Sequence, residues 1–544
     1  MAQFNTSNKL KNNKIMKNIN FLFVLIFLFS LGFTSCEEFL EETVKDQIAV
    51  DYIYTTPAGL EVGVNALYNQ MRYYNLPSGD NSDLWANVFF MVATDLGLHR
   101  TWNTPYGTGH NPAAYTGSKW IQGYKIIDRC SAIITSARSV SMDENAKKRL
   151  VAQARVIRGE LYLDLKQMYG GILIDTIPTT PENINDPVEY KVASDADVYK
   201  LIDGDLDYAI ANLPYKVDVG RYGQGVARHI RGKSALWQQD WTGAAAQFDA
   251  IIEDGTHALV PLVEVWGQNA NHKESLFTYQ KDFLLGPNDN LAGGGGSWLS
   301  SVFTNRTYEL KPSELVQEVA YGGQSLGWFY PNNYLKLLYN QADDLRFKTY
   351  YYSDNYLDYK INVPENPNYG QPITNPAIAA PNGNYRAWHW SLKKYHDTEK
   401  LPQSSDSYKG YMYYRLAETY LLGAEAHHNL GNDTKALQYL NKVRRRGYTG
   451  DPLSANAAND ILVWTLNNYL DESARELAFE NNRWFLLKRL GLLVERQNLY
   501  FRSSPSGTIS GEVQLKMTPA MVNMPIPQSQ IDLMGKPEGF NVGY

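Results

Sequence analysis

Apolar residues between positions 197 and 213 recur every three or four residues, the spacing of one face of an α-helix. The stripe consists of Val198, Leu201, Ile202, Leu206, Ala209, Ile210 and Leu213. The same spacing predicts helices over 56–73, 145–169 and 464–490, and a further helix beginning near Trp120. Gly170, Gly171 and Gly491 lie where helices commonly end. We therefore expect a mainly α-helical chain.

Two segments, 225–253 and 415–446, repeat one pattern of small and large residues. In each, one small residue is followed after 12 positions by a second, and large apolar residues stand four and seven positions beyond the second. The members are Gly232, Ala244, Phe248 and Ile251, and then Ala424, Ala436, Leu440 and Val443. Small residues let two antiparallel helices approach closely, while the large ones fill the groove. The pattern predicts tetratricopeptide-like helical hairpins.

The helical spacing fades between about residues 255 and 407. Glycines 293–296, proline and asparagine clusters and short aromatic runs take its place. Loops of this length are uncommon in compact domains unless they have a function. We expect an irregular, loop-rich insertion that packs on the helical scaffold and holds the binding surface.

The N-terminus has the pattern of a bacterial lipoprotein signal peptide. Four lysines precede the apolar run 21–33, and small residues lead to Cys36. The run is shorter than the roughly 20 residues that a membrane span needs. Residues 1–35 are therefore predicted to be removed, with 1–15 as an upstream extension if Met16 is the start. The mature chain, 36–544, would be tethered by lipid on Cys36.

Composition excludes one class of partner. The chain has 51 basic and 57 acidic side chains, and the four lysines of the leader leave the mature chain with a net charge of about −10. Binding to nucleic acid requires an excess of Lys and Arg, so we expect no nucleic-acid partner. The chain is rich in aromatic residues, with 39 Tyr and 12 Trp, most of which we expect to pack between helices. An excess beyond what the core needs suits a surface that binds sugars, peptides or proteins.

Motifs for catalysis or metal binding are weak. The segment 323–327 reads G-x-S-x-G, but Trp328 and Pro331 follow where a nucleophile elbow needs a helix. His427 and His428 are adjacent on a predicted helix, so they point about 100° apart and cannot chelate one ion. Pairs three residues apart, Glu472 with Arg475 and Glu480 with Arg483, are expected to be structural ion pairs. We expect neither an enzyme nor a metal site, and no cofactor.

Several short segments together resemble the SusD/RagB family of surface nutrient-binding lipoproteins. They occur in the order that the family shows, from residue 36 to the C-terminus. The matching segments are Cys36-Glu37-Glu38, 51–57, 154–162, 169–171, 344–346, 415–418, 424–426, 475–480, 483–485 and 525–528. The resemblance implies a SusD-like fold with tetratricopeptide-like helices.

The same resemblance implies a function. Such proteins capture an oligosaccharide at the cell surface, anchored by lipid to the outer membrane of a Bacteroidetes-type bacterium, and deliver it to a partner TonB-dependent, SusC-like transporter. They bind without catalysis. An oligopeptide ligand on the same scaffold is the first alternative, and a surface hydrolase is a remote one.

A glycan site needs aromatic faces on loops, close to amide, carboxylate or guanidinium groups. Three clusters in the sequence meet this description. The candidate ligand-binding residues are Arg100, Trp102, Asn103, Trp298, Trp328 and Tyr330. All are expected to be exposed on loops.

Overall fold

The structure, a computed structural model, describes residues 54–76, 82–99, 106, 117–282, 296–309, 312–339, 343–352, 359–373, 389–500 and 517–543. All of them belong to one compact unit, Ile53–Tyr544. The predicted signal peptide and Cys36 lie outside the described residues. No helix in the described part of the chain is both long and apolar enough to cross a membrane.

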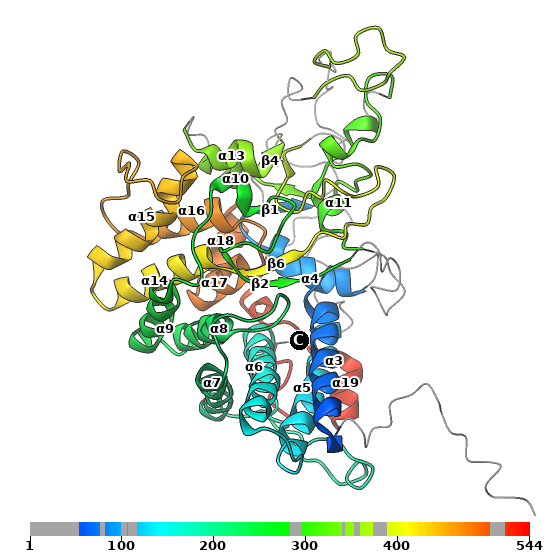
Figure 1. The fold of residues 1–544 in the computed structure, drawn as a ribbon, viewed down its shortest axis with the longest axis vertical. Helices are drawn as coiled ribbons and strands as arrows, with labels where there is room; N and C mark the ends of the chain where they lie inside the picture. Colours follow the sequence, from blue (N-terminus) through cyan, green and yellow to red (C-terminus); the bar gives the residue numbers. More distant parts are fainter. Residues whose placement is uncertain are drawn as a thin grey trace, which may run out of the picture. The chain divides into compact units, whose positions relative to one another are not determined.

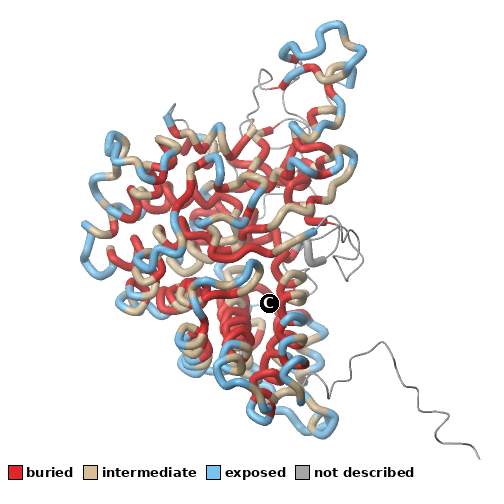
Figure 2. Tube along the Cα trace, in the orientation of Figure 1, coloured by how far each residue is buried: buried red, intermediate tan, exposed pale blue. Residues whose placement is uncertain are grey.

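Helices of the first half pack side by side. They are α3 (Pro57–Asn75), α4 (Ser82–Val92), α5 (Gly117–Ser136), α6 (Glu144–Tyr169) and α7 (Asp195–Asn212). Helix α6 contacts α3, α5 and α7, and most of its residues are buried (Figures 1 and 2). Local chemistry sets their ends, because the Thr56 and Ser194 side chains accept from backbone N–H groups in the first turns of α3 and α7. The predicted helices 56–73, 145–169 and 197–213 are confirmed.

Both predicted hairpins are present. They are α8 (Gln224–Trp237) with α9 (Trp241–Asp254), and α14 (Leu416–Asn429) with α15 (Asp433–Thr449). Helix α9 also packs against α14. A Cβ atom on Gly232 would lie 2.6 Å from the Phe248 ring, so the first hairpin depends on a residue without a side chain. Ala244, Ala424 and Ala436 are fully buried. The mainly helical, tetratricopeptide-like fold is thus confirmed.

The helices and strands between α9 and α14 are short. They are α10 (Leu262–Val265), β2 (Ser275–Tyr279), α11 (Leu299–Phe303), β3 (Phe329–Pro331), α12 (Asn333–Leu338), α13 (Leu345–Tyr350), β4 (Tyr351–Tyr352) and β5 (Ser391–Leu392). Strand β2 pairs with β6 (Tyr411–Arg415), β4 with β5, and β1 (Gly97–His99) with β3, all antiparallel. The strand pairs therefore connect the loop-rich region to both helical halves.

One predicted helix is wrong in its extent. Residues 464–490 form two helices, α16 (Leu466–Leu477) and α17 (Arg483–Arg489), and the chain continues to α18 (Leu493–Tyr500) and α19 (Gln528–Leu533). Phe479 and Asn481, between α16 and α17, have φ of 63° and 65°. The Lys394 ammonium donates to the carbonyls of Glu476 and Ala478 at 2.8 and 3.1 Å, which replaces the missing helical donors.

The break also changes the predicted ion pairs. Glu472 and Arg475 do pair, at 3.1 Å. The pair between Glu480 and Arg483 is not formed, because the helical spacing is lost between them. Glu480 instead binds Lys394 and Arg415, and Arg483 binds Asp95 at 2.8 Å.

A buried charge network ties the loop-rich region to the helices. The Glu476 carboxylate accepts from Arg346, Arg415 and Arg446 at 3.2, 2.8 and 2.6 Å. Arg346 also pairs with Asp344 at 2.8 Å, and Arg415 with Glu274 at 2.9 Å. Every one of these side chains is at most 3% exposed. Removing one member would leave a buried charge unpaired, which is strongly destabilising.

Candidate functional site: an aromatic platform on the loop-rich region

Trp298 stands immediately before α11, a single turn held by the buried side chains of Leu299, Val302 and Phe303. Its indole is half-buried, and Nε1 donates to Oδ1 of Asp406 at 2.8 Å. Backbone hydrogen bonds between Ser297 and Ser407, 2.7 and 2.9 Å long, bring the two segments together. A Cβ atom on Gly296 would lie 2.3 Å from the Ser407 carbonyl, so this approach requires glycine.

A third segment, 321–328, packs against the same turn. Leu326 donates its backbone N–H to Ser301 at 2.7 Å, and Trp328 donates to Val302 at 2.8 Å. These bonds place the Trp328 ring 6.2 Å from that of Trp298, at an interplanar angle of 63°. We call Trp298, Asp406 and Trp328 the Trp298 platform. In this platform the Trp328 ring packs beside the Trp298 indole, and the Asp406 carboxylate orients the indole through its Nε1 group.

Two candidate residues are less exposed than the sequence indicates. Trp328 is 7% exposed and Tyr330 is 2% exposed. Tyr330 lies in β3, opposite Leu98 of β1, and its ring stacks on His389 at 4.8 Å. The expectation that both are exposed is wrong. Tyr330 is covered by strand pairing with Leu98, more than 200 positions away, and Trp328, in the loop directly before β3, packs against Trp298. Their contact with a ligand stays a prediction.

Arg100, Trp102 and Asn103 lie outside the described residues. Strand β1 ends at His99, directly before Arg100 in the sequence, and His99 pairs with Phe329, the neighbour of Trp328. The last described residue before this cluster, His99, therefore pairs with the strand that directly follows Trp328.

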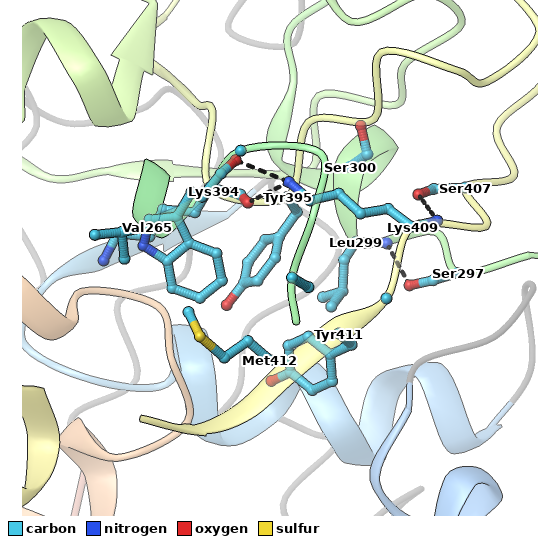
Figure 3. Close-up of a pocket in the computed structure, with 14 residues that line it drawn as sticks. Val265, Ser297, Leu299, Ser300, Lys394, Tyr395, Ser407, Lys409, Tyr411 and Met412 are labelled. Atoms are coloured by element: carbon cyan, nitrogen blue, oxygen red, sulfur yellow. Dashed lines mark hydrogen bonds between the residues drawn. The ribbon is translucent and has the colours of Figure 1, made fainter. Parts of the chain in front are cut away.

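A pocket is lined by Ser297, Leu299 and Ser407, the sequence neighbours of Trp298 and Asp406 (Figure 3). It encloses about 380 Å³, including the part open to solvent. Its lining combines hydroxyl groups, aromatic rings and amines, from Ser297, Ser300, Ser407, Trp266, Tyr395, Tyr411, Lys394 and Lys409, with aliphatic side chains between them. Lys409 donates to the carbonyls of Trp266 and His396, both at 2.9 Å. Burial lowers the pKa of Lys394 and of Lys409 to about 8.

Sequence reasoning missed this pocket and the partner of Trp298. The lining residues come from segments near 266, 297, 394 and 410, which no local spacing connects. The polar character of 404–407 is visible in the sequence, but nothing there indicates that Asp406 faces Trp298.

The G-x-S-x-G segment is structural. Ser325 is fully buried, and its Oγ donates to the Asn305 carbonyl at 2.7 Å. The adjacent histidines face different partners, since His427 binds Asp249 and His428 binds Asp433. Among the described residues no group of three or more His, Cys, Asp or Glu side chains is placed to hold a metal ion.

The fold and the sequence both match one family. A sequence model of the SusD family matches residues 267–544, which is just over half of the chain and includes the whole Trp298 platform. The chain therefore belongs to the SusD family.

Relatives match over nearly the full length. SusD-like protein P25 of Formosa agariphila is 23% identical over 96% of this chain and 97% of its own length. A SusD-like protein of Bacteroides ovatus is 23% identical over 84% of this chain and 80% of its own length.

Solved structures show the same fold. One, described as a laminarin-binding SusD-like protein, has a TM-score of 0.68 and 21% identity and covers 90% of this chain and 100% of its own. Surface glycan-binding protein A from Bacteroides thetaiotaomicron, in complex with laminarihexaose, has a TM-score of 0.68 and 18% identity over 89% of this chain and 98% of its own.

Proposed function

We propose that this protein is a cell-surface glycan-binding lipoprotein that captures an oligosaccharide. The observation that supports this most directly is the Trp298 platform, in which a half-buried indole is held by Asp406 and flanked by Trp328. The C–H face of a sugar ring stacks on such an indole, and hydroxyls at the ring edge need a carboxylate or amide partner. Asp406 keeps acceptor capacity for a hydroxyl, since a carboxylate has about four lone-pair sites.

The remaining candidates have different proposed roles. Arg100, Trp102 and Asn103 would extend the platform, because the sequence places them directly after β1. Trp328, which is buried and packs beside Trp298, would support that indole from the side, and the buried Tyr330 would act through packing rather than through ligand contact. Similarity in fold to proteins described as binding laminarin or laminarihexaose favours an oligosaccharide ligand over a peptide.

We further propose that the ligand is delivered to a TonB-dependent, SusC-like transporter at the outer membrane. The family membership supports this partner, and the predicted lipid anchor at Cys36 would hold the protein on the outer leaflet. The protein would bind without catalysis, since the Ser325 hydroxyl, the candidate nucleophile in the described chain, is buried and bonded to a carbonyl.

A binding screen tests the proposal. The soluble chain from Glu37 onward would be titrated calorimetrically with laminarihexaose, laminarin, other neutral and acidic glycans, and a panel of peptides. We expect a glycan to bind and Trp298→Ala to weaken it, while Trp237→Ala, which changes a half-buried indole on α8, leaves affinity unchanged. Binding of peptides alone would contradict the glycan assignment and favour the oligopeptide alternative.

Co-purification tests the delivery step. The transporter encoded by the same organism should be recovered with the lipid-anchored protein from detergent-solubilised outer membranes. Recovery of the anchored protein without any outer-membrane transporter would contradict this part of the proposal.

A further inference from the structure

Lys400 contacts two of the segments that build the Trp298 platform, and only 4% of its surface is exposed. Its ammonium donates to Oγ of Ser301 and to the carbonyl of Gln324, both at 3.1 Å. Among the described residues, no carboxylate lies within ion-pair distance of Lys400. Burying an ammonium without a carboxylate partner costs free energy unless the group is well hydrogen-bonded. The burial of Lys400 therefore indicates a role for its two hydrogen bonds.

Each acceptor of Lys400 belongs to a segment that builds the platform. Ser301 is three residues after Trp298, and its Oγ donates to the carbonyl of Ser405, the neighbour of Asp406, at 2.7 Å. Gln324 donates its N–H to the Pro402 carbonyl at 2.6 Å and precedes Trp328 by four residues. One ammonium therefore connects the segments that carry Trp298, Asp406 and Trp328.

We infer that Lys400 is a positioning residue for the Trp298 platform: the charged ammonium holds the three segments in the ligand-binding arrangement, and loss of its proton loosens them. This inference rests on the proposed function, because it concerns the same site. Its physical basis is that hydrogen bonds from a charged donor are about twice as strong as neutral ones. A neutral amine in the same place would hold Ser301 and Gln324 less firmly.

The ammonium loses its proton within an accessible pH range. Burial lowers the pKa of Lys400 to about 8, against the attraction of Asp397 and Asp406. Burial, together with Lys409 and Lys400, lowers the pKa of His396 to about 4, so this imidazole is neutral throughout. Two other amines of this region, Lys409 and Lys394, titrate in the same range, because burial lowers the pKa of each to about 8 as well.

The two other segments packed against Lys400, residues 297–304 and 321–328, carry no group that titrates near pH 8. Residues 297–304 contain no titratable side chain. In the segment 321–328 the one titratable group is Tyr321, whose hydroxyl accepts from the backbone N–H of Lys360 and whose pKa is raised by burial. A transition near pH 8 at the platform therefore belongs to Lys400, Lys409 or Lys394, and its loss in Lys400→Met separates Lys400 from the other two.

Loss of the Lys400 proton is expected to loosen the platform without unfolding the protein. Because the folded pKa of Lys400 lies below the unfolded value of 10.5, the folded state binds fewer protons than the unfolded state between about pH 8 and 10.5. The contribution of Lys400 to folding stability therefore rises with pH in this window. Ligand binding and the contribution of Lys400 to folding stability should change in opposite directions above pH 8.

The experiment observes Trp298 directly. The chain from Glu37 onward is labelled with 5-fluorotryptophan, and the ¹⁹F resonance of Trp298 is identified by its loss in Trp298→Phe. We expect this resonance to shift between pH 7 and 9.5 with a midpoint near 8. In Lys400→Met it should be displaced at all pH values and not titrate, whereas Lys409→Met should keep the transition. A resonance that does not titrate, or that titrates equally in Lys400→Met, would overturn the inference.

Affinity gives the second readout. For laminarihexaose at pH 7, we expect Lys400→Met to bind about fivefold more weakly than the parent chain, and the parent to weaken by a similar factor on going to pH 9. Lys400→Arg, which stays charged, should show no such pH dependence. Equal affinity of the parent and Lys400→Met would contradict the inference. Failure of the parent itself to bind would count against the proposed function for this glycan, while the ¹⁹F titration still decides the role of Lys400.

Discussion

The Nε1 of Trp298 donates a 2.8 Å hydrogen bond to Asp406, 108 residues further along the chain. This bond orients the indole that we propose as the stacking surface for a sugar, and it joins two segments that also share a backbone bridge between Ser297 and Ser407. The candidate site is therefore built by contacts between loops, while the tetratricopeptide-like helices provide the base on which those loops pack.

Replacing Trp298 with Ala should weaken glycan binding about tenfold. Stacking contributes about 0.5–1.5 kcal/mol beyond area burial, and the lost apolar contact adds roughly 25 cal/mol per Å². Asp406→Asn, which keeps one acceptor oxygen, should weaken binding less. Calorimetric titration measures both variants. Unchanged affinity in Trp298→Ala, with a melting temperature near that of the parent, would remove Trp298 from the site.

Gly232→Ala should destabilise the first hairpin by about 1–3 kcal/mol, the usual cost of overpacking. The added methyl would lie 2.6 Å from the Phe248 ring, and Phe248 is fully buried. Gly204→Ala on α7 is the matched control, because nothing lies within 4 Å of its Cβ position. Since alanine is the better helix former, that control should stabilise the protein by about 0.5–1 kcal/mol. Denaturant unfolding of both variants measures whether the free energy of unfolding falls in Gly232→Ala and rises in Gly204→Ala.

Glu476→Gln should cost about 3–5 kcal/mol of folding stability, because it leaves the buried guanidinium groups of Arg346, Arg415 and Arg446 without their shared carboxylate. Glu189→Gln changes an exposed pair with Lys191, 3.8 Å apart, and should have little effect. Thermal and denaturant unfolding compare the two. A loss below about 1 kcal/mol in Glu476→Gln would show that the network relaxes around the substitution.

Acid should destabilise the fold between about pH 4.5 and 2. Burial raises the pKa of Glu472, but Arg346, Arg475 and Arg444 outweigh it and lower the value to about 2. A carboxyl with a depressed folded pKa contributes stability above its unfolded pKa and loses it as pH falls through the folded one, here by about 3 kcal/mol. Free energies of unfolding at pH 5, 3.5 and 2.5 would measure the slope, which Glu472→Gln should reduce. An unchanged slope in Glu472→Gln would assign the acid sensitivity to other carboxyls.

Cys36→Ser should release the protein from the outer membrane, since only the thiol accepts the lipid. Detergent phase separation and cell fractionation measure this, with Cys130→Ser as a control that leaves the anchor in place. Cys130 is fully buried, so its variant is checked for folding first. Continued membrane partitioning of Cys36→Ser in cells without the transporter would contradict the predicted anchor.

The sequence by itself determined the helices and hairpins. Apolar spacing, capping residues such as Thr56 and Ser194, and the small residues Gly232 and Ala424 act within one turn or between neighbouring helices. Local chemistry is therefore enough to predict α3, α6, α7 and the two tetratricopeptide-like pairs. The family resemblance was also carried by short segments that can be read one at a time.

Only the tertiary structure decided what surrounds the candidate site. The break between α16 and α17 depends on Lys394, more than 80 residues away, and the burial of Tyr330 depends on strand β1. Asp406 reaches Trp298, and Lys400 reaches Ser301 three residues further on, through contacts of the same long range. Helical spacing acts over three or four residues, whereas loops are positioned by whichever distant backbone and charged groups satisfy their hydrogen bonds. That pairing has no local pattern, so the sequence could indicate the aromatic residues but not which of them remain exposed.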